Sequence, residues 1–394
     1  MNILMISLDP ALLDVTSAAH QRHRAFAALA GNLTILVRIR AGATGIIHDE
    51  ALTLIPVTAP RAWQMIPRLI AAARRLHDRY DLIVTQDMFL SGVVGALVKR
   101  RFAAPLLVQS HTTVFDNPVW IAEKPYQRRA LLVLARWVLR AADAVRTVNQ
   151  HEATALKRRG VLQVHVLPLA TASADFVGVP PEHAVAMRAE LGLSDSDRVM
   201  LWLGHPIAFK RVDLLIPILE RAASRFASIV LVIVGADDST KMRLQTAAHQ
   251  HGLAHRLILR PPMASHRVPV LFACADVYAL TSSYEGLPRV IFEAGAAGIP
   301  AVAFRVPGVD EVIDDGVTGY LVDDGDLEAF AARIVSLLND PTRAQAMGES
   351  ARQIVLERYK ADAYPAKWVG VWRAVVSAKN PTQRRESAKA QGES

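Results

Sequence analysis

Short apolar runs alternate with longer amphipathic stretches through the first half of this sequence. The apolar runs that we expect to be strands are residues 3–7, 33–37, 82–85, 105–109 and 144–148. Stretches with helical periodicity lie between them, at residues 16–30, 62–78 and 124–142. This alternation is typical of a parallel, doubly wound sheet with helices on its faces.

A second series of the same kind follows a polar interruption. Residues 170–197 hold Pro180, Pro181 and a run of Ser and Asp, which predicts an interdomain linker and a short helix. Further strands are expected at residues 199–203, 229–234, 257–259, 277–281 and 301–303. The sequence therefore predicts an α/β protein with two Rossmann-like domains. Their ligand site should lie in a cleft where the carboxyl ends of two parallel sheets face each other.

The polar interruption sets the predicted domain boundaries. The N-terminal domain is expected over residues 1–176 and the C-terminal domain over residues 177–360. A last helix is expected over residues 361–378. Residues 379–394 are polar without apolar periodicity, so we expect them to be disordered.

Composition and charge narrow the classes of protein. The chain has 394 residues, is 52% hydrophobic and contains one cysteine, Cys274, which excludes a disulfide-stapled fold and a cysteine-rich metal site. No apolar run reaches the roughly 20 residues needed to cross a bilayer, and no basic segment precedes Arg22, so we expect a cytoplasmic protein. The net charge of +8 lies entirely within residues 1–190. An anionic membrane surface, a phosphorylated acceptor or nucleic acid are candidate partners for that half.

The segment 280–322 carries the most specific pattern in the chain. It reads Thr-Ser-Ser-Tyr-Glu-Gly-Leu-Pro from Thr281 and Phe-Glu-Ala-Gly-Ala-Ala-Gly-Ile-Pro from Phe292. A strand should end near Thr281, and a helix should begin at Pro288, because proline is tolerated in a first helical turn. The helix should end at Gly298, which is followed by Ile and Pro.

Two carboxylates stand on either side of this predicted helix start. Glu285 lies in the loop before the helix and Glu293 lies inside the helix. The backbone N–H groups around Leu287 form a site for an anion, because a helix N-terminus leaves its first amides unpaired. The pattern predicts a sugar bound next to a phosphate.

In this context, Glu-x7-Glu resembles the retaining GT-B glycosyltransferases of family 4, the glycosyl transferases group 1. The continuation from Val306 to Val322, Val-Pro-Gly-Val-Asp-Glu and onward, is similar to the next segment of that family. The resemblance covers most of the second half strongly and the first half more loosely. It implies that Glu293 binds the nucleotide ribose, that Glu285 lies against the donor sugar, and that Gly286, Leu287 and Pro288 hold the diphosphate.

The loop after the strand at residues 199–203 supplies candidate cations. It reads Gly-His-Pro-Ile-Ala-Phe-Lys-Arg, and Lys210 occupies the family's lysine position. A cation is needed there because the leaving nucleoside diphosphate gains negative charge in the transition state. His205 stands where the family usually has Arg, which removes a bidentate, permanently charged ligand. Arg211 is the candidate to replace that charge.

The first half contributes one candidate, His111, which follows the strand at residues 105–109. The resemblance implies that His111 contacts the donor sugar. Relatives often have Asp two residues later, where this chain has Thr113, so we expect different hydrogen bonding in this loop. The resemblance also implies that the helix at residues 361–378 crosses back to brace the N-terminal domain.

These features predict a retaining, metal-independent hexosyltransferase with the residues above as its site. It would move a sugar from a UDP- or GDP-linked donor to a glycan or lipid-linked acceptor in bacterial cell-surface polysaccharide or glycolipid synthesis. No cofactor is expected, since the nucleotide sugar is a substrate. His249, His251 and His255 do not indicate a metal site, because no carboxylate pattern completes one. The basic half predicts peripheral attachment to the inner face of the cell membrane.

Three alternatives compete with this interpretation. The first is a non-catalytic nucleotide-sugar-binding protein of the same fold, which is suggested by His205 and by the absence, after the first strand, of the Gly-Gly pair that the family often carries. A glycoside hydrolase using Glu285 and Glu293 is the second, although a hydrolase has no need for a phosphate site at a helix N-terminus. A nucleic-acid-binding protein is the third, but the basic half lacks a stacking motif or a recognisable module. The donor base, the sugar, the acceptor and the oligomeric state stay open.

Overall fold

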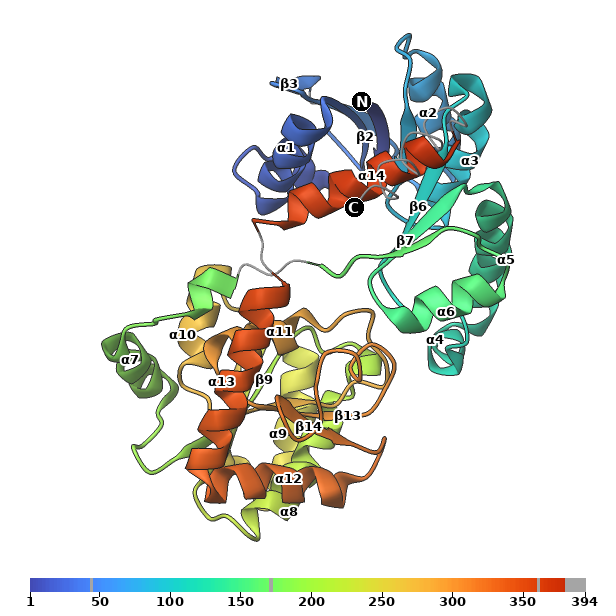
Figure 1. Ribbon diagram of the computed structural model, residues 1–394. Coiled ribbons are helices and arrows are strands. Elements are labelled where there is room, and N and C mark those ends of the chain that lie inside the picture. The colour runs from blue at the N-terminus through green and yellow to red at the C-terminus, as the bar shows by residue number, and fades with distance from the viewer. Residues whose placement is uncertain (43–44, 170–172, 360–361, 380–394) are drawn as a thin grey trace, which may run out of the picture. The chain divides into compact units, whose positions relative to one another are not determined.

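The computed structural model describes residues 1–42, 45–169, 173–359 and 362–379, which form two compact units (Figure 1). Unit 1 comprises Met1–Asn117, Lys124–Pro168 and the chain from Asp362 onward, and unit 2 comprises Pro118–Glu123 and Leu169–Ala361. The division after Pro168 precedes the boundary predicted after residue 176, because a 3-10 helix, Ser173–Phe176, packs within unit 2. The ring of Phe176 there lies 5.8 Å from that of Phe272. The tail from residue 380, predicted to be disordered, lies outside the described residues.

An eight-stranded sheet forms the centre of unit 1. Its order is β3-β4-β2-β1-β5-β6-β7-β8, with β3 antiparallel to β4 and every other pair parallel. The strands are β1 (Asn2–Ser7), β2 (Asn32–Ile39), β3 (Ile47–Asp49), β4 (Leu52–Thr58), β5 (Leu82–Thr85), β6 (Leu106–Ser110), β7 (Ala144–Thr147) and β8 (Val164–Val166). The runs predicted as strands are β1, β2, β5, β6 and β7, whereas β3, β4 and β8 were not predicted.

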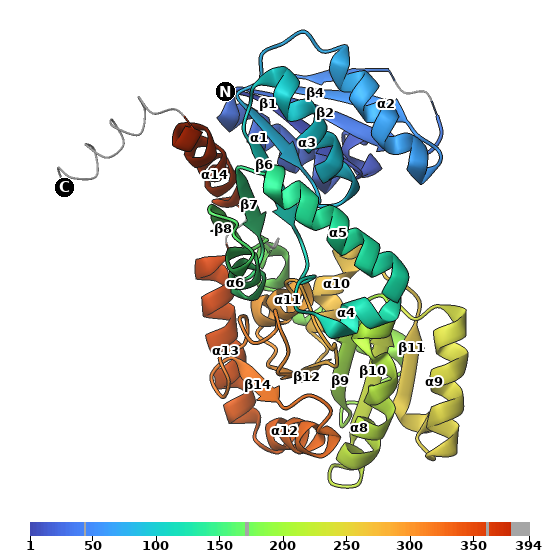
Figure 2. The same ribbon diagram turned by 90° about the vertical axis from the view of Figure 1, so that its right-hand side faces the viewer.

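Helices cover both faces of this sheet. On one face, α1 (Ala18–Ala30) packs against α14 (Tyr364–Lys379), and on the other lie α2 (Ala62–Arg74), α3 (Leu90–Phe102) and α5 (Pro125–Ala141) (Figure 2). α6 (Gln150–Arg158) packs on β7 and β8. The helix predicted over residues 361–378 is α14, and it belongs to unit 1. Its rings of Trp368 and Trp372 lie 5.9 and 5.7 Å from that of Phe26 in α1.

Unit 2 is built on a six-stranded parallel sheet. Its order is β11-β10-β9-β12-β13-β14. The strands are β9 (Arg198–Leu203), β10 (Ile229–Val234), β11 (Leu257–Arg260), β12 (Val277–Leu280), β13 (Ala301–Phe304) and β14 (Gly319–Val322). The strand order runs in opposite directions on the two sides of the β9–β12 pair. This is the topological switch point, where parallel sheets bind ligands beyond their carboxyl ends.

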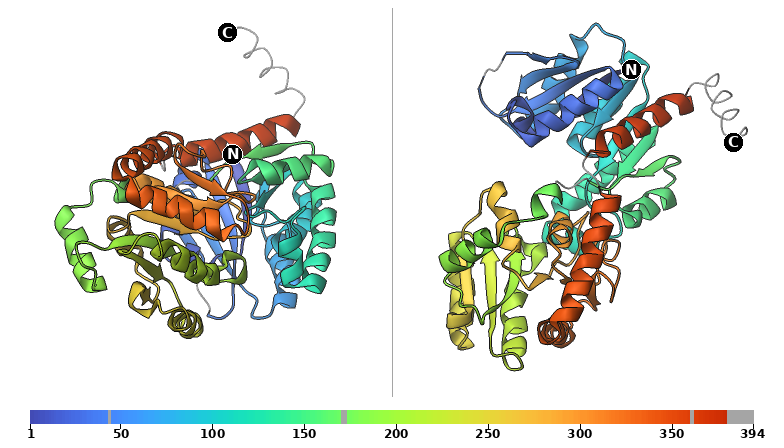
Figure 3. Two further views of the ribbon diagram at one scale, coloured as in Figure 1. Left: turned by 90° about the horizontal axis from the view of Figure 1, so that it is seen from below. Right: turned by 60° about the vertical axis from the view of Figure 1, so that its left-hand side comes forward.

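Helices also cover both faces of the second sheet (Figure 3). One face carries α8 (Leu215–Ala223), α9 (Asp238–Gln250) and α12 (Leu327–Asn339), and the other carries α7 (Pro181–Leu191), α10 (Val268–Phe272), α11 (Arg289–Ala297) and α13 (Pro341–Arg358). The short helix α4 (Pro118–Glu123) also belongs to unit 2, where it contacts the 3-10 helix Ala208–Lys210. Within the described residues, no helix is both long enough and apolar enough to span a bilayer.

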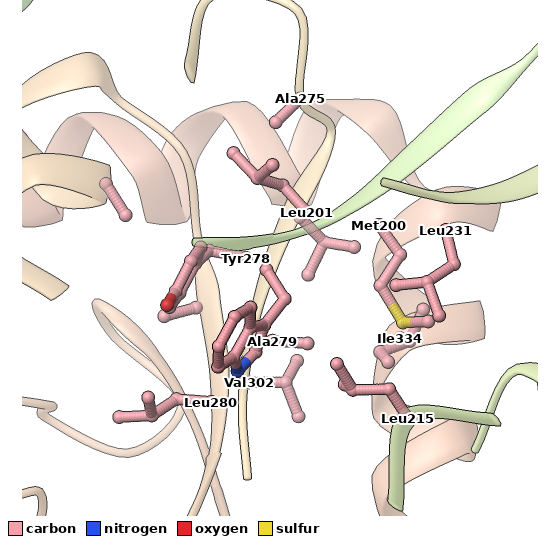
Figure 4. Packing of buried hydrophobic residues seen from close by; sticks show 14 of the residues in the cluster. Met200, Leu201, Leu215, Leu231, Ala275, Tyr278, Ala279, Leu280, Val302 and Ile334 are labelled. Atoms are coloured by element: carbon pink, nitrogen blue, oxygen red, sulfur yellow. The ribbon is translucent and has the colours of Figure 1, made fainter. Parts of the chain in front are cut away.

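The core of unit 2 lies between its central strands and the helices on each face. Because both faces are covered, the strands are apolar along their whole length, and every residue of β10 is buried. Figure 4 shows Met200, Tyr278 and Val302, which come from three neighbouring strands and are each fully buried; the strand register puts Met200 and Val302 on one face of the sheet and Tyr278 on the other. Removing a side chain of this kind costs about 2–5 kcal/mol of stability. This core fixes the loops that follow β9 and β12.

Candidate active site

The loops that follow β9 and β12 are joined by direct hydrogen bonds. The amide of Ser283 donates to the carbonyl of Phe209 at 2.8 Å, and the Thr281 hydroxyl donates to the carbonyl of Lys210 at 2.8 Å. The rings of Phe209 and Tyr284 stack with centroids 4.6 Å apart. Neighbouring strands therefore deliver two segments far apart in sequence to one place at the carboxyl edge of the sheet.

Lys210 and Glu285 form an ion pair at this place. The Nζ of Lys210 lies 2.9 Å from Oε1 of Glu285, and the hydroxyl of Ser282 donates to the same oxygen at 2.8 Å. Glu285 is buried. A buried carboxylate requires a nearby cation and hydrogen-bond donors, and both are present here.

The helix predicted after Glu285 is α11, and its start suits an anion. Pro288 is the N-cap residue and offers no side-chain oxygen to the first-turn amides. A helix N-terminus that its own cap does not satisfy attracts negative charge. The helix ends at Gly298 with a φ of 77°, as the sequence predicted.

Glu293 lies in α11 with its side chain only 18% exposed. Burial raises the pKa of Glu293 above its ordinary value, and the positive charges of Arg289 and Lys210 oppose that rise. An Nη atom of Arg289 lies 3.8 Å from Oε1 of Glu293. The carboxyl group is thus placed to accept hydrogen bonds from the hydroxyl groups of a ligand.

These groups line one hollow of about 450 Å³. Its lining residues are Leu203, Gly204, His205, Lys210, Glu285, Leu287, Pro288, Arg289, Val290 and Glu293. The hollow combines a cation, a helix N-terminus and two carboxylates. That set can hold an anionic phosphate beside a group rich in hydroxyls. Among the described residues, no group of three or more His, Cys, Asp and Glu is arranged to hold a metal ion.

Arg211 corrects one expectation. Its guanidinium donates to the carbonyls of Thr281 and Ser282 at 2.8 and 3.0 Å and pairs with Asp324. The residue has a φ of 46°, so the chain turns sharply after Lys210 and directs the side chain to the end of β12. Arg211 does not line the hollow, so it does not lie where the expected replacement for the charge at His205 would have to be.

Gly308 packs against the candidate site, and the sequence analysis did not single it out. It has a φ of +85°, and a Cβ built on it would lie 2.3 Å from the carbonyl oxygen of Glu285 and 2.9 Å from that of Gly286. The amide of Glu285 donates to the carbonyl of Pro307 at 3.0 Å. The loop after β13 therefore supports the Glu285 loop through backbone contacts and this hydrogen bond. The signal was the Val-Pro-Gly triplet, but only the fold shows what the glycine faces.

In unit 1, His111 follows β6 as predicted, and the residue is solvent-exposed. Its Nδ1 lies 3.4 Å from an Nη atom of Arg146 on β7. The surrounding protein desolvates the imidazole even though it keeps accessible surface. This desolvation, followed by the positive charges of Arg146 and Arg22, lowers the pKa of His111. The ring is therefore neutral near pH 7.

The loop that carries His111 is anchored by Glu152, which the sequence analysis did not identify. This fully buried carboxyl group accepts hydrogen bonds from the hydroxyl of Ser110 at 3.3 Å and the amide of Val114 at 3.2 Å. Burial raises the pKa of Glu152 to about 7, although the loop amides oppose this. Asn149 donates to the hydroxyl of Thr113 at 3.1 Å. The start of α6 thus supplies hydrogen bonds to this loop.

Comparison with known proteins supports the family that the sequence motifs indicated. Residues 185–354 match the family described as glycosyl transferases group 1, and residues 15–170 match the glycosyl transferase 4-like domain. The D-inositol 3-phosphate glycosyltransferase of Xylanimonas cellulosilytica is 30% identical over 291 residues, which are 72% of this chain and 70% of that protein. The chain belongs to the group 1 glycosyltransferases.

A further sequence relative and two solved structures are also similar to this group 1 glycosyltransferase. The D-inositol 3-phosphate glycosyltransferase of Segniliparus rotundus is 29% identical over 275 residues, which are 68% of this chain but only 61% of that protein, less than two thirds of its length. Sucrose-phosphate synthase from Thermosynechococcus elongatus superposes with a TM-score of 0.79 at 22% identity, over 96% of this chain and 100% of that one. HepE from Anabaena, solved with UDP, superposes with a TM-score of 0.76 at 20% identity, over 95% of this chain and 100% of that one. These structures confirm the predicted GT-B fold.

Within this glycosyltransferase, the structure gathers most of the predicted donor residues in one hollow. Lys210, Glu285 and Glu293 line it together, and His205 and the Leu287–Pro288 segment line it as well. Gly286 lies in the same loop, directly before Leu287.

Proposed function

We propose that this group 1 glycosyltransferase moves a hexosyl unit from a UDP- or GDP-linked donor to an acceptor hydroxyl. The observation that supports this is the ion pair of Lys210 and Glu285 beside the N-terminus of α11. As the glycosidic bond breaks, negative charge grows on the leaving nucleoside diphosphate. Lys210 and the helix amides offer positive charge where that diphosphate would lie. HepE of Anabaena has been solved with UDP and with UDP-glucose, which supports a nucleotide-sugar donor.

The predicted site residues have distinct roles in this proposal. Glu293 accepts hydrogen bonds from the ribose hydroxyls, and Gly286, Leu287 and Pro288 form the loop that receives the diphosphate. His205 lies beside the phosphates. Glu285 orients the donor sugar, and His111 in unit 1 donates a hydrogen bond to a sugar hydroxyl. No metal or cofactor takes part, because the cation and the helix N-terminus meet the charge of the diphosphate.

The proposed transfer retains the configuration of the anomeric carbon. Lys210 and Ser282 both bind the carboxylate of Glu285, which lowers its nucleophilicity. We therefore do not assign it to a covalent intermediate. In the proposed transfer, the acceptor attacks on the face from which the diphosphate departs, and the diphosphate receives the acceptor's proton.

The donor site can be tested by thermal unfolding with UDP, GDP or ADP, with and without a chelator. One nucleotide should stabilise the protein by about 2.7 kcal/mol at a concentration 100 times its Kd. Glu293→Ala should abolish this shift, because it removes the ribose acceptor. Glu357→Ala, an exposed glutamate on α13, is the matched control and should keep it. A shift that Glu293→Ala leaves unchanged, or that the chelator removes, would contradict the proposal.

A non-catalytic nucleotide-sugar-binding protein is the second candidate. It is favoured by one observation: Arg211 is bound to Thr281 and Ser282 instead of lining the hollow, so it does not supply the charge that the family resemblance implies at the position of His205. The two candidates differ in turnover. A nucleotide that stabilises the protein, combined with no release of that nucleotide from any of its sugars, would favour the second candidate.

We further propose that the acceptor is a lipid-linked or growing surface glycan and that α5 attaches the enzyme to an anionic membrane. The helix buries Leu132 and Val138 in unit 1 and exposes its opposite side. That side carries Tyr126 at 86%, Val133 at 64% and Trp137 at 43% exposure. Three arginines, 129, 136 and 140, share this exposed side. No acidic residue lies between Lys124 and Ala142. Exposed aromatic residues between arginines are typical of an interfacial helix.

Sedimentation with vesicles tests this attachment. Binding to vesicles containing phosphatidylserine should be strong at low salt and weak at high salt, since each arginine near such a surface contributes about 1 kcal/mol. Replacing Arg129, Arg136 and Arg140 with glutamine should abolish binding. The control replaces three exposed arginines of unit 2, at positions 225, 243 and 305, which changes the net charge equally. Equal loss in both triple variants would show that net charge alone, and not α5, causes binding.

A further inference from the structure

Arg146, a fully buried arginine, contacts His111 from the neighbouring strand β7. Arg146 occupies the third position of β7, a strand whose four residues are all buried. Strands of a parallel sheet that is covered on both faces normally carry apolar side chains. A buried guanidinium is costly unless partners compensate it, so this position requires an explanation.

The partners of Arg146 are unusual because, among the described residues, they include no carboxylate. One Nη atom donates to the carbonyl of Leu167 and to the hydroxyl of Tyr364, the latter at 3.3 Å. The guanidinium carbon lies 4.8 Å from the ring centre of Trp368. The Nε atom is buried and has no hydrogen-bond partner in the part of the chain that the structure describes. Burial lowers the pKa of Arg146 to about 10, and Tyr364 opposes that shift. The guanidinium stays charged at neutral pH.

The other Nη atom lies 3.4 Å from Nδ1 of His111. A guanidinium has donors and no acceptor, so Nδ1 must present its lone pair to Arg146. The imidazole proton is then on Nε2. Arg146 from β7 and Arg22 from α1 are the charged groups that act on this ring, and both disfavour a second proton.

We propose that Arg146 is a positioning residue that holds His111 in the neutral tautomer with its proton on Nε2. The exposed nitrogen of His111 is then always a hydrogen-bond donor, and it suits a sugar hydroxyl acting as acceptor. The benefit for donor binding rests on the proposed function, whereas the tautomer does not. A merely structural role, linking β8 to α14, would leave the state of His111 unchanged.

The first test needs no variant. Nitrogen chemical shifts of ¹⁵N-histidine-labelled protein, with His111 assigned by loss of its signals in His111→Asn, should show Nε2 protonated and Nδ1 unprotonated from pH 5.5 to pH 8. A wild-type His111 protonated on Nδ1, or one that titrates near the ordinary value of about 6.5, would overturn the proposal.

The second test replaces Arg146 with methionine, which is apolar and similar in length. The pKa of His111 should rise, because the nearest cation is gone, and both neutral tautomers should become populated. KM for the donor should increase by about twofold if the two tautomers become equally populated, because only one of them donates from Nε2. Arg146→Lys should restore the tautomer and the wild-type KM. Unchanged His111 spectra in a folded Arg146→Met protein would overturn the proposal.

Tyr364→Phe is the matched control. It removes another hydrogen bond of Arg146 without touching His111, so the His111 spectra and the KM should stay as in wild type. His111→Ala separates this proposal from the function on which it rests. If that variant keeps the wild-type KM while the spectra behave as expected, Arg146 controls the tautomer, but His111 does not contact the donor.

Discussion

Replacing Lys210 with alanine should lower kcat by about 10²–10³, the usual cost of removing one preorganised electrostatic contact to a developing charge. Its ammonium group is 2.9 Å from Glu285 in the hollow, and Arg211, the next cation of that loop, is bound elsewhere and does not substitute for it. The loss should appear in single-turnover rates with the nucleotide sugar. KM should change less, because the charge on the diphosphate is largest in the transition state.

Two controls separate the chemistry from damage to the site. Lys210→Ala leaves Glu285 buried without its cation, so the double variant with Glu285→Gln reports whether that carboxylate causes the defect. Lys241→Ala, on an exposed position of α9, tests for a general effect of lost charge and should keep wild-type kcat. A Lys210→Ala enzyme with more than one third of wild-type kcat would contradict the proposed role.

Gly308→Ala should abolish donor binding and destabilise unit 2. The new Cβ would overlap the backbone of Glu285 at 2.3 Å, and backbone atoms cannot move aside as a flexible side chain can. The residue also has a φ of +85°, which costs any non-glycine residue about 1–2 kcal/mol. We expect a lower melting temperature and no stabilisation by any nucleotide.

Gly316→Ala provides the matched comparison. Gly316 lies in the same β13–β14 connection with a φ of +79°, but no described atom lies within 4 Å of the place that an added methyl group would take. It should therefore show the cost of backbone strain alone, with nucleotide binding intact. Equal behaviour of the two variants would show that the contact between Gly308 and the Glu285 loop is not required.

The strands that could be predicted from the sequence are those buried on both faces. Continuous apolar runs such as β10 have no other stable environment, so their pattern is clear. β4 was not predicted, because Pro56 interrupts its apolar run. In the fold, β3 pairs only with residues 52–54 of β4, so Pro56 lies where β4 has a neighbour on one side only. β3 and β8 are too short to show a period.

Glu285 and Glu293, the two carboxylates proposed to bind the donor, could be predicted because they lie in one continuous segment. One loop and one helix carry Glu285 and Glu293, and local rules for helix starts and ends describe both elements. Arg146 and Glu152 could not be predicted in this way, because each acts on the loop that carries His111, which lies far from both of them in the sequence. A charged residue in the apolar run of β7 was visible in the sequence, but its partner, the loop after β6, emerges only when parallel strands pair.

α14 has a consequence for how the chain is made. The core around Phe26 in α1 is completed by Trp368 and Trp372, which a ribosome adds more than three hundred residues later. Unit 2, apart from α4, is one continuous stretch that precedes α14. During synthesis, the domain that starts first is therefore finished last. The exposed apolar side of α1 must wait for the end of translation, while the later domain can already fold.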